Sequence, residues 1–311
     1  MTTSLDCLPC FLKQTVLALR LSGANQQIQK AVLIAVSEEI KKTDFSKPPA
    51  WTTTFIHRAI RKTLGIDPFK EVKSRYNQIA LSLYPELKEL VDKSPDPLWT
   101  ATRLAIAGNV IDFGIFSSVD IDGTIRRALN GDIAVDHFEH FKEALITQKK
   151  VLYLLDNAGE IVFDRLLIEL LKEMGVKVIA VVKGGPVLND CTQVDARETS
   201  LDKITEVITN GSDFIGTILE FTSESFRKTF SEASLIISKG QGNFETLSSY
   251  INQQSSPISV FGGESNTSGH NTTEITPKKV FFLFQSKCEV VSRELGLPVG
   301  SMLLSSCEIS P

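Results

Sequence analysis

The chain has 311 residues, of which 42% are hydrophobic and 23% are charged, and its 33 basic and 37 acidic side chains give a formal net charge of -4. This composition is typical of a globular enzyme with a well-filled core and argues against a disordered or fibrous chain. There is no general basic field, and no apolar run approaches the roughly 20 residues that span a bilayer, so we expect neither a nucleic-acid partner nor a membrane partner.

The amino-terminal residues and the cysteines both favour a cytoplasmic protein. Residues 1–6 contain no basic n-region and no apolar h-region, which argues against secretion. The five cysteines are an odd and sparse set, unlike the disulfide framework of a small secreted domain. The oligomeric state stays open at this stage.

Residues 1–149 are predicted to form a helical domain. A first helix begins at Cys7 and Cys10, and further helices are predicted at 25–42, 51–64, 67–92, 98–113 and 134–148. Gly65 ends the second of these segments, and Pro95 and Pro97 separate the third from the fourth. Because hardly any stretch alternates with period two, no strand is expected in this half.

The pattern changes after Lys150. An apolar run at 151–155, a helical segment at 161–174 and a second apolar run at 176–182 are typical of the strand–helix–strand unit of a parallel sheet. Further strands are predicted at 204–208, 233–237, 258–261 and 280–284, and a closing helix at 288–295. Residues 150–311 are therefore predicted to form a Rossmann-like α/β domain with a mostly parallel sheet, on which the helical half packs. The polar segment 252–277 within it is typical of a surface loop.

Polar residues follow four of the predicted strands, at the edge where open parallel sheets bind ligands. They are Asp156, Asn157 and Glu160; Lys183, Asn189 and Asp190; Asn210 and Asp213; and Lys239 and Asn243. Carboxylates that converge on one edge suit a hard divalent cation, and lysines beside glycine-rich turns suit a phosphate. A cation and a phosphate together indicate phosphoryl chemistry.

Each of these residues also has a purely structural interpretation. Asp156 taken alone can equally be the N-cap of the next helix, and Lys183 taken alone is typical of a solvated turn. Asn109 and Asp112 lie three residues apart on one helix face in an apolar segment, where they form either a structural network between the two halves or part of the site. The recurrence of polar residues at successive strand ends favours a functional interpretation of the set.

In this order the motifs resemble those of the metal-dependent damage-control phosphatase family, over nearly the whole chain. They are Cys7 and Cys10; Asp67, Pro68, Phe69, Lys70, Lys73 and Asn77; Gly108, Asn109 and Asp112; Asp156, Asn157 and Glu160; Lys183, Asn189 and Asp190; and Lys239 and Asn243. The chain looks like the stand-alone prokaryotic subgroup. The resemblance implies a helical domain beside a Rossmann-like sheet, and hydrolysis of phosphate monoesters such as sugar phosphates and damaged metabolites.

The resemblance also implies roles for the matching residues. The ligands of a divalent metal ion, for which Mg²⁺, Mn²⁺, Co²⁺ and Ni²⁺ all stay open, are matched by Asp156, Asn157 and Asp190. The residues that line this site are matched by Asn109, Asp112 and Glu160, and the lysine that meets the phosphate by Lys239. Gln285 stands where relatives often have a basic residue, and the segment 248–278 is longer than expected, so the choice of substrate stays open.

We therefore expect a metal-dependent phosphatase that hydrolyses a small phosphorylated metabolite by attack of metal-activated water. The expected catalytic residues are Asp156, Asp190 and Lys239. The residues expected to bind the substrate are Asn109, Asp112, Glu160, Lys183, Asp213 and Asn243. The proton acceptor is expected to be either Asp190 or Asp213.

Two other functions stay in view. One is a carboxyl methyltransferase that uses S-adenosylmethionine, since a eukaryotic relative has been described as such. That function predicts a glycine-rich end to the first strand and an acid at the end of the second, whereas the second strand here ends in Lys183. The other is a non-catalytic metal- or metabolite-binding protein that uses the helix of Cys7 and Cys10, although two unpaired thiols are the simpler interpretation of that pair.

Overall fold

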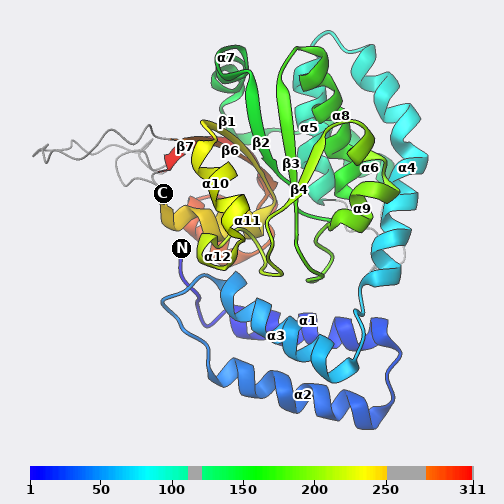
Figure 1. Cartoon of the computed structure of the whole chain (residues 1–311), viewed down its shortest axis with the longest axis vertical. Helices are drawn as coiled ribbons and strands as arrows, with labels where there is room; N and C mark the ends of the chain where they lie inside the picture. The colour runs from blue at the N-terminus through cyan, green and yellow to red at the C-terminus, as the bar shows by residue number, and fades with distance from the viewer. Residues whose placement is uncertain (111–120, 251–277, 310–311) are drawn as a thin grey trace, which may run out of the picture.

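A seven-stranded, mostly parallel sheet forms the centre of the molecule (Figure 1). The computed structural model describes residues 1–110, 121–250 and 278–309. In spatial order the strands are β1 (Ile133–Asp136), β7 (Met302–Ile309), β6 (Lys278–Gln285), β5 (Leu235–Lys239), β2 (Lys150–Leu154), β3 (Lys177–Val182) and β4 (Glu206–Thr209). Neighbouring strands of this described sheet run parallel except for β6 and β7. The predicted α/β fold class is therefore confirmed.

Helices cover both faces of the sheet and one of its edges (Figure 1). In chain order the α-helices of the described residues are α1 (Cys7–Ser22), α2 (Gln26–Lys41), α3 (Pro49–Leu64), α4 (Lys70–Asp92), α5 (Pro97–Val110), α6 (Ile121–Asn130), α7 (Phe138–Gln148), α8 (Glu160–Glu173), α9 (Gln193–Glu198), α10 (Glu224–Glu232), α11 (Gln241–Leu247) and α12 (Glu289–Leu295). One buried cluster joins α4, α5, α7 and α8 to one face, and a second joins α10, α11 and α12 to the other. A third cluster holds α1–α3 together.

The central strand β2 is apolar at every position after the exposed Lys150. Val151 and Tyr153 belong to the cluster on one face of the sheet, and Leu152 and Leu154 belong to the cluster on the other. Successive side chains of a strand point to opposite faces, so a strand covered by helices on both sides needs apolar residues at every position. All four side chains are buried, and the polar residues of this part of the chain begin where the strand ends.

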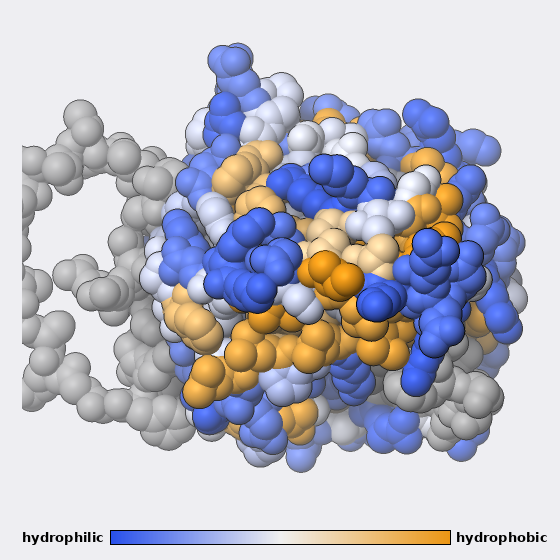
Figure 2. All heavy atoms as spheres, turned by 90° about the horizontal axis from the view of Figure 1, so that it is seen from below, coloured by the Kyte–Doolittle hydropathy of each residue, from blue (hydrophilic) through white to orange (hydrophobic). Residues whose placement is uncertain are grey.

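Helices α1–α3 form a layer below the strands in the view of Figure 1. Local signals set their ends: Asn25 Oδ1 accepts the Ile28 N–H at 3.0 Å at the start of α2, and Gly65 ends α3 with φ 72°. Seen from below, this layer presents an apolar band to solvent (Figure 2). The exposed side chains Leu12, Val16, Leu33 and Ile34 belong to α1 and α2. None of the described helices is both long enough and apolar enough to cross a bilayer.

Two strands were not predicted from the sequence. β1 lies in the half that was expected to be purely helical, where we predicted a helix over 134–148; the helix α7 begins only at Phe138. β1 is a four-residue edge strand with half-exposed side chains, too short to give a clear period of two. β7 follows the predicted closing helix and pairs antiparallel with β6. The predicted strand 258–261 and the end of the predicted helix 98–113 lie outside the described residues.

Candidate active site

The loops that follow β2 and β3 meet at the carboxyl edge of the sheet. Asn157 and Asp190 form an isolated antiparallel β-bridge. The Cys191 N–H donates to the Asp156 carbonyl oxygen at 2.8 Å, and the Ala158 N–H donates to the Asn189 carbonyl oxygen at 2.9 Å. These backbone bonds bring the three residues expected to bind the metal, Asp156, Asn157 and Asp190, into one place.

Two amide groups lie between two carboxylates at the centre of this site. Asn109 Nδ2 donates to Asp156 Oδ2 at 3.0 Å and to Glu160 Oε2 at 2.9 Å. Asn157 Nδ2 donates to the same two oxygen atoms, at 2.6 and 3.1 Å. Because both N–H groups of each amide are used, each amide oxygen points away from the carboxylates. Asn109 Oδ1 is buried and has no hydrogen-bond partner among the described residues.

Glu160 is held from its other side by a buried lysine. Lys239 Nζ donates to Glu160 Oε1 and to Asp164 Oδ1, both at 2.6 Å, and to the Ala105 carbonyl oxygen at 2.8 Å. Tyr153 donates its hydroxyl to the same Asp164 oxygen at 2.7 Å. Burial lowers the pKa of Lys239, but the two carboxylates outweigh burial, so the pKa is raised and the ammonium stays charged. Lys239 therefore lies beneath the site, with 0% of its surface exposed.

A cavity of about 300 Å³ opens in front of the two amides. Its described lining consists of Gln14, Leu17, Phe69, Tyr76, Gly108, Asn109, Asp156, Asn157, Ala158, Leu188, Asn189, Asp190, Ile215, Gln241, Gly242 and Lys287. Helix α1 contributes Gln14 and Leu17, so the α1–α3 layer forms one wall of the cavity. The volume lies at the lower end of the range for small-molecule sites, roughly 300–1,000 Å³.

The two carboxylates that line the cavity are costly to ionise in this structure. Burial, followed by the charges of Glu160 and Asp190, raises the pKa of Asp156 well above its usual value. Burial also raises the pKa of Asp190 to about 6, although the charge of Lys183 opposes that shift. Such carboxylates are stabilised by a nearby cation, because opposite charge favours the ionised form.

The available donors fit a hard divalent cation. Among the described residues, no three His, Cys, Asp or Glu side chains gather into a metal-binding group. A cation in this cavity would therefore be held by two carboxylates together with amide oxygens, which are ligands that Mg²⁺ and similar ions accept. The partnerless Asn109 Oδ1 and the raised pKa of Asp156 are both features that a bound cation would favour.

Four residues expected to bind the substrate do not line this cavity: Glu160, whose contacts are given above, and Lys183, Asn243 and Asp213. Lys183 is buried, donates to the Gly216 carbonyl oxygen and lies 3.5 Å from Asp190 Oδ2. Asn243 is buried and accepts from Thr217 Oγ1 while donating to the Lys239 carbonyl oxygen, each at 2.8 Å. Asp213 is bound by Arg58 and Arg61 of α3. Asn109 does line the cavity, and Asp112 lies outside the described part of the chain.

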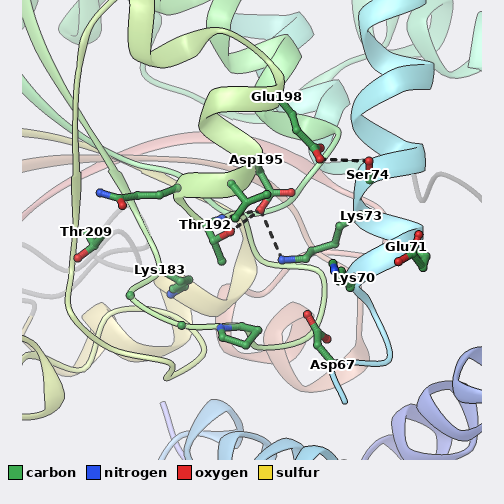
Figure 3. Close-up of a pocket in the computed structure, with 15 residues that line it drawn as sticks. Asp67, Lys70, Glu71, Lys73, Ser74, Lys183, Thr192, Asp195, Glu198 and Thr209 are labelled. Atoms are coloured by element: carbon green, nitrogen blue, oxygen red, sulfur yellow. Dashed lines mark hydrogen bonds and ion pairs between the residues drawn. The ribbon is translucent and has the colours of Figure 1, made fainter.

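A second cavity of about 510 Å³ lies between α4 and α9 (Figure 3). Lys73 points across it to Asp195, and its ammonium lies 3.4 Å from Asp195 Oδ2 and 3.4 Å from the Asp190 carbonyl oxygen. Beside it, Asn77 accepts the Gly159 N–H at 2.8 Å and donates to Asp195 at 3.0 Å. Helix α4 therefore fixes both the start of α8 and the loop that carries Asp190.

Sequence reasoning missed Lys287, which lines the smaller cavity from the loop between β6 and α12. The strand before it was predicted, and Gln285 directly after that strand was noted as a departure from the family, but Lys287 was not assigned to the site. Reading every strand end in the same way would have found Lys287.

A family model described as the damage-control phosphatase ARMT1-like domain matches residues 3–303. The chain belongs to this family. It is 36% identical over 306 residues to the uncharacterized protein MJ0202 of Methanocaldococcus jannaschii, covering 96% of this chain and 93% of that one. It is 35% identical over 280 residues to the damage-control phosphatase of Archaeoglobus fulgidus, covering 88% of each. It is 31% identical over 307 residues to the damage-control phosphatase PH1575 of Pyrococcus horikoshii, covering 97% of each.

A solved structure is similar over the whole chain. It is a crystal structure of the DUF89 family protein PH1575 from Pyrococcus horikoshii, with a TM-score of 0.83, 30% sequence identity and 100% coverage of both chains. The family predicted from the sequence motifs is therefore confirmed, and the protein is a phosphatase, as its relatives are. Membership of the family also indicates dependence on a divalent metal ion and a small phosphorylated substrate.

Proposed function

We propose that the protein hydrolyses a small phosphate monoester in the 300 Å³ cavity, beside a divalent cation held by Asp156, Asn157 and Asp190. The observation that carries this proposal is that the buried carboxylates of Asp156 and Asp190 line one cavity with the amides of Asn109 and Asn157. The N–H groups of both amides face Asp156 and Glu160, so their oxygen atoms point away from those two carboxylates. A bound cation would offset the repulsion between the carboxylates of Asp156 and Asp190, and the amide oxygen of Asn157 would be available to hold it. When bound, it withdraws charge from a phosphoryl oxygen and favours the attack of water.

Glu160 and Lys239 position the amides in this proposal. Glu160 Oε2 receives one N–H from Asn109 and one from Asn157, so a reversed amide would place its oxygen against carboxylate oxygens. Lys239 fixes Glu160 from behind and stays charged through its second partner, Asp164. Lys239 thus acts through Glu160 and lies too deep, at 0% exposure, to be a free contact for the substrate.

Asp190 is the proton acceptor in this proposal, rather than Asp213. Asp190 lines the cavity, and among the described residues its Oδ2 has only an ion pair with Lys183 at 3.5 Å. Asp213 lies outside the cavity and is engaged by two guanidinium groups. A general base must lie within hydrogen-bond reach of the proton that it accepts, directly or through one water.

The α1–α3 layer gives the cavity a partly apolar wall and limits the size of the substrate. Leu17 of α1 faces the polar edge of the sheet together with Phe69, Leu188 and Ile215. These apolar side chains limit the water around a bound substrate, and Gln14 and Gln241 add polar groups whose amides are hydrogen-bonded within the protein. A substrate of the size of a sugar phosphate suits this combination.

The test is hydrolysis of an aryl phosphate by metal-stripped protein, with Mg²⁺, Mn²⁺, Co²⁺ and Ni²⁺ added back one at a time. We expect turnover that depends on the added metal and that is lost in Asp156→Ala, together with Mn²⁺ binding measured by calorimetry. Asp202→Ala is the matched control, because Asp202 is exposed and lines neither of the two cavities described above. Near-normal turnover by Asp156→Ala, with circular dichroism unchanged, would show that the site is wrongly assigned.

A further inference from the structure

The turn that leads to Asp190 carries a leucine where a glycine would fit without strain. The Asp190 N–H donates to the Val187 carbonyl oxygen at 3.0 Å, which closes a four-residue turn. Of the two central residues of this turn, Leu188 has a positive φ of 45° and Asn189 does not. This is the pattern of a type II′ turn, whose first central position is ordinarily taken by glycine. A bulky side chain in this conformation raises the free energy of the folded chain.

The backbone of this turn is fixed by the loop that follows β2. The Asn189 carbonyl oxygen accepts the Ala158 N–H at 2.9 Å, and Asp190 forms a β-bridge with Asn157. A relaxed conformation at Leu188 would therefore pull Asp190 out of the site. Since glycine would satisfy the same backbone without strain, the leucine side chain itself is expected to have a use here.

The Leu188 side chain lies between the two parts of the molecule that enclose the cavity. It packs against the buried cluster that holds α1–α3 together, and against a smaller cluster of Ala50, Val187 and Ile215. These contacts leave Leu188 only half-buried, and it lines the 300 Å³ cavity. The loop that carries a proposed metal ligand thus also supplies apolar surface to the cavity.

The cavity has a polar part and an apolar part, and Leu188 belongs to the second. The polar part is formed by the hydrogen-bonded groups Asn109, Asp156 and Asn157 together with Asp190, and the apolar part by Leu17, Phe69, Leu188 and Ile215. Leu188 joins the apolar part together, because Leu17 and Phe69 belong with it to one cluster and Ile215 to the other. In the proposed function, on which this inference rests, the cation and the phosphate occupy the polar part. The leaving group of the ester then extends into the apolar part.

We propose that Leu188 selects the leaving group of the substrate, by packing against the C–H surface of the alcohol that is esterified to the phosphate. Esters of alcohols with an apolar surface, such as the ring of a sugar or an aryl group, gain binding free energy from this contact. Inorganic phosphate and esters of very short alcohols do not. Because the leaving group keeps the contact in both the ground state and the transition state, Leu188 affects KM and leaves kcat nearly unchanged.

The experiment compares variants of Leu188 in Mn²⁺-loaded protein, with methyl phosphate, butyl phosphate and inorganic phosphate as competitive inhibitors of aryl phosphate hydrolysis. Leu188→Gly and Leu188→Asn both tolerate a positive φ and remove the apolar side chain, whereas Leu188→Met keeps an apolar side chain of similar size. The control is Lys149→Gly, because Lys149 also has a positive φ of 47° but is exposed and lines neither of the two cavities described above.

We expect the parent protein to bind butyl phosphate more tightly than methyl phosphate, by roughly ten- to fiftyfold for three further CH₂ groups. Leu188→Gly and Leu188→Asn should each reduce this preference by about tenfold and raise KM for the aryl phosphate to a similar extent. Leu188→Met and Lys149→Gly should keep the preference. Inhibition by inorganic phosphate and Mn²⁺ affinity should stay within twofold of the parent in all four variants.

Three results would overturn the assignment. The first is a preference for butyl phosphate in Leu188→Gly and Leu188→Asn that equals that of the parent, or no such preference in an active parent. The second is a loss of Mn²⁺ or inorganic phosphate affinity as large as the loss of butyl phosphate affinity, because Leu188 would then act through the position of Asp190. The third is an equal loss in Leu188→Met. Failure of the proposed function looks different: the parent protein itself would show no turnover with any of the four metals.

Discussion

Gly240 lies directly against the carboxylate of Asp156: a Cβ atom added to Gly240 would come within 1.9 Å of Asp156 Oδ2. Gly240 also has φ +78°, a conformation that other residues rarely adopt. The glycine between β5 and α11 therefore provides the space that the central carboxylate of the site occupies. The motif that begins at Lys239 therefore contributes to the site in two ways: through the lysine, and through Gly240, which has no side chain.

Gly240→Ala should accordingly displace the Asp156 carboxylate and abolish Mn²⁺ binding. Gly175→Ala is the matched control, because Gly175 has φ +79° and nothing within 4 Å of an added Cβ atom. We expect the control to lose roughly 1 kcal/mol of stability through backbone strain and to keep its metal affinity. Calorimetric titration of both variants decides the point. Normal Mn²⁺ affinity in Gly240→Ala would mean that the position of Asp156 is unimportant for the metal.

Glu160→Gln should lower metal affinity without touching a proposed ligand. The NH₂ group of the new amide must face either the Lys239 ammonium or the N–H groups of the two asparagines. In either orientation two hydrogen-bond donors face each other, which is unfavourable. Loss of such an outer partner typically costs roughly 10- to 100-fold in metal affinity. The control is Glu173→Gln, an exposed position on the same helix. Equal Mn²⁺ affinities in the two variants would contradict the positioning role of Glu160.

Asp213→Asn should affect stability rather than catalysis. Burial alone would raise the pKa of Asp213, but the hydrogen bonds and charges of Arg58 and Arg61 hold it below its usual value. These ion pairs join α3 to the loop after β4, and they are partly exposed, so we expect a loss of about 1 kcal/mol. Urea unfolding and kcat should be measured together. A large drop in kcat, with the acidic limb of the pH profile lost, would instead identify Asp213 as the proton acceptor.

Glu245 should make stability fall as the pH rises. Its burial raises its pKa to about 7 from an ordinary value of 4.5, despite hydrogen bonds from Gln241 and the Ala50 N–H. Between these two values the folded protein holds a proton that the unfolded chain has released, so the contribution to stability declines across that window, by an amount on the order of 3 kcal/mol. The difference in unfolding free energy between the parent and Glu245→Gln, followed from pH 5 to 8, checks this. A difference that is constant with pH, as expected for the exposed control Glu232→Gln, would contradict it.

The sequence predicted that polar residues would gather at the carboxyl edge of the sheet, because these residues come in the segments that follow apolar runs. Asp156, Asn157 and Asp190 converge as expected, since the strands before them are buried on both faces and easily recognised. The roles of the lysines could not be predicted from their positions after the strands. Lys239 lies at the end of a strand and precedes a glycine, but its ammonium forms ion pairs with Glu160 and Asp164 of α8.

A signal for that pairing was present in the chain. Glu160 and Asp164 are four residues apart and therefore share one face of α8. Two carboxylates buried on an otherwise apolar helix face require a cation. What the sequence could not supply is the identity of that cation, because it depends on β5 lying next to β2 in the sheet. Strand order is a long-range property, and for the same reason the pairing of β1 with β7 was missed.

That last pairing constrains when the sheet can be completed. β7 separates β1 from β6, and it holds His137, just after β1, through the side chain of Ser306, 169 positions further along the chain. A growing chain therefore carries β1 without a partner, and β6 with one open edge, until nearly all of it has been synthesised. Unpaired strand edges promote association between chains. A chain that stops before residue 302 would keep every residue of the proposed metal site and yet expose two such edges, so its expected failure is aggregation rather than loss of chemistry.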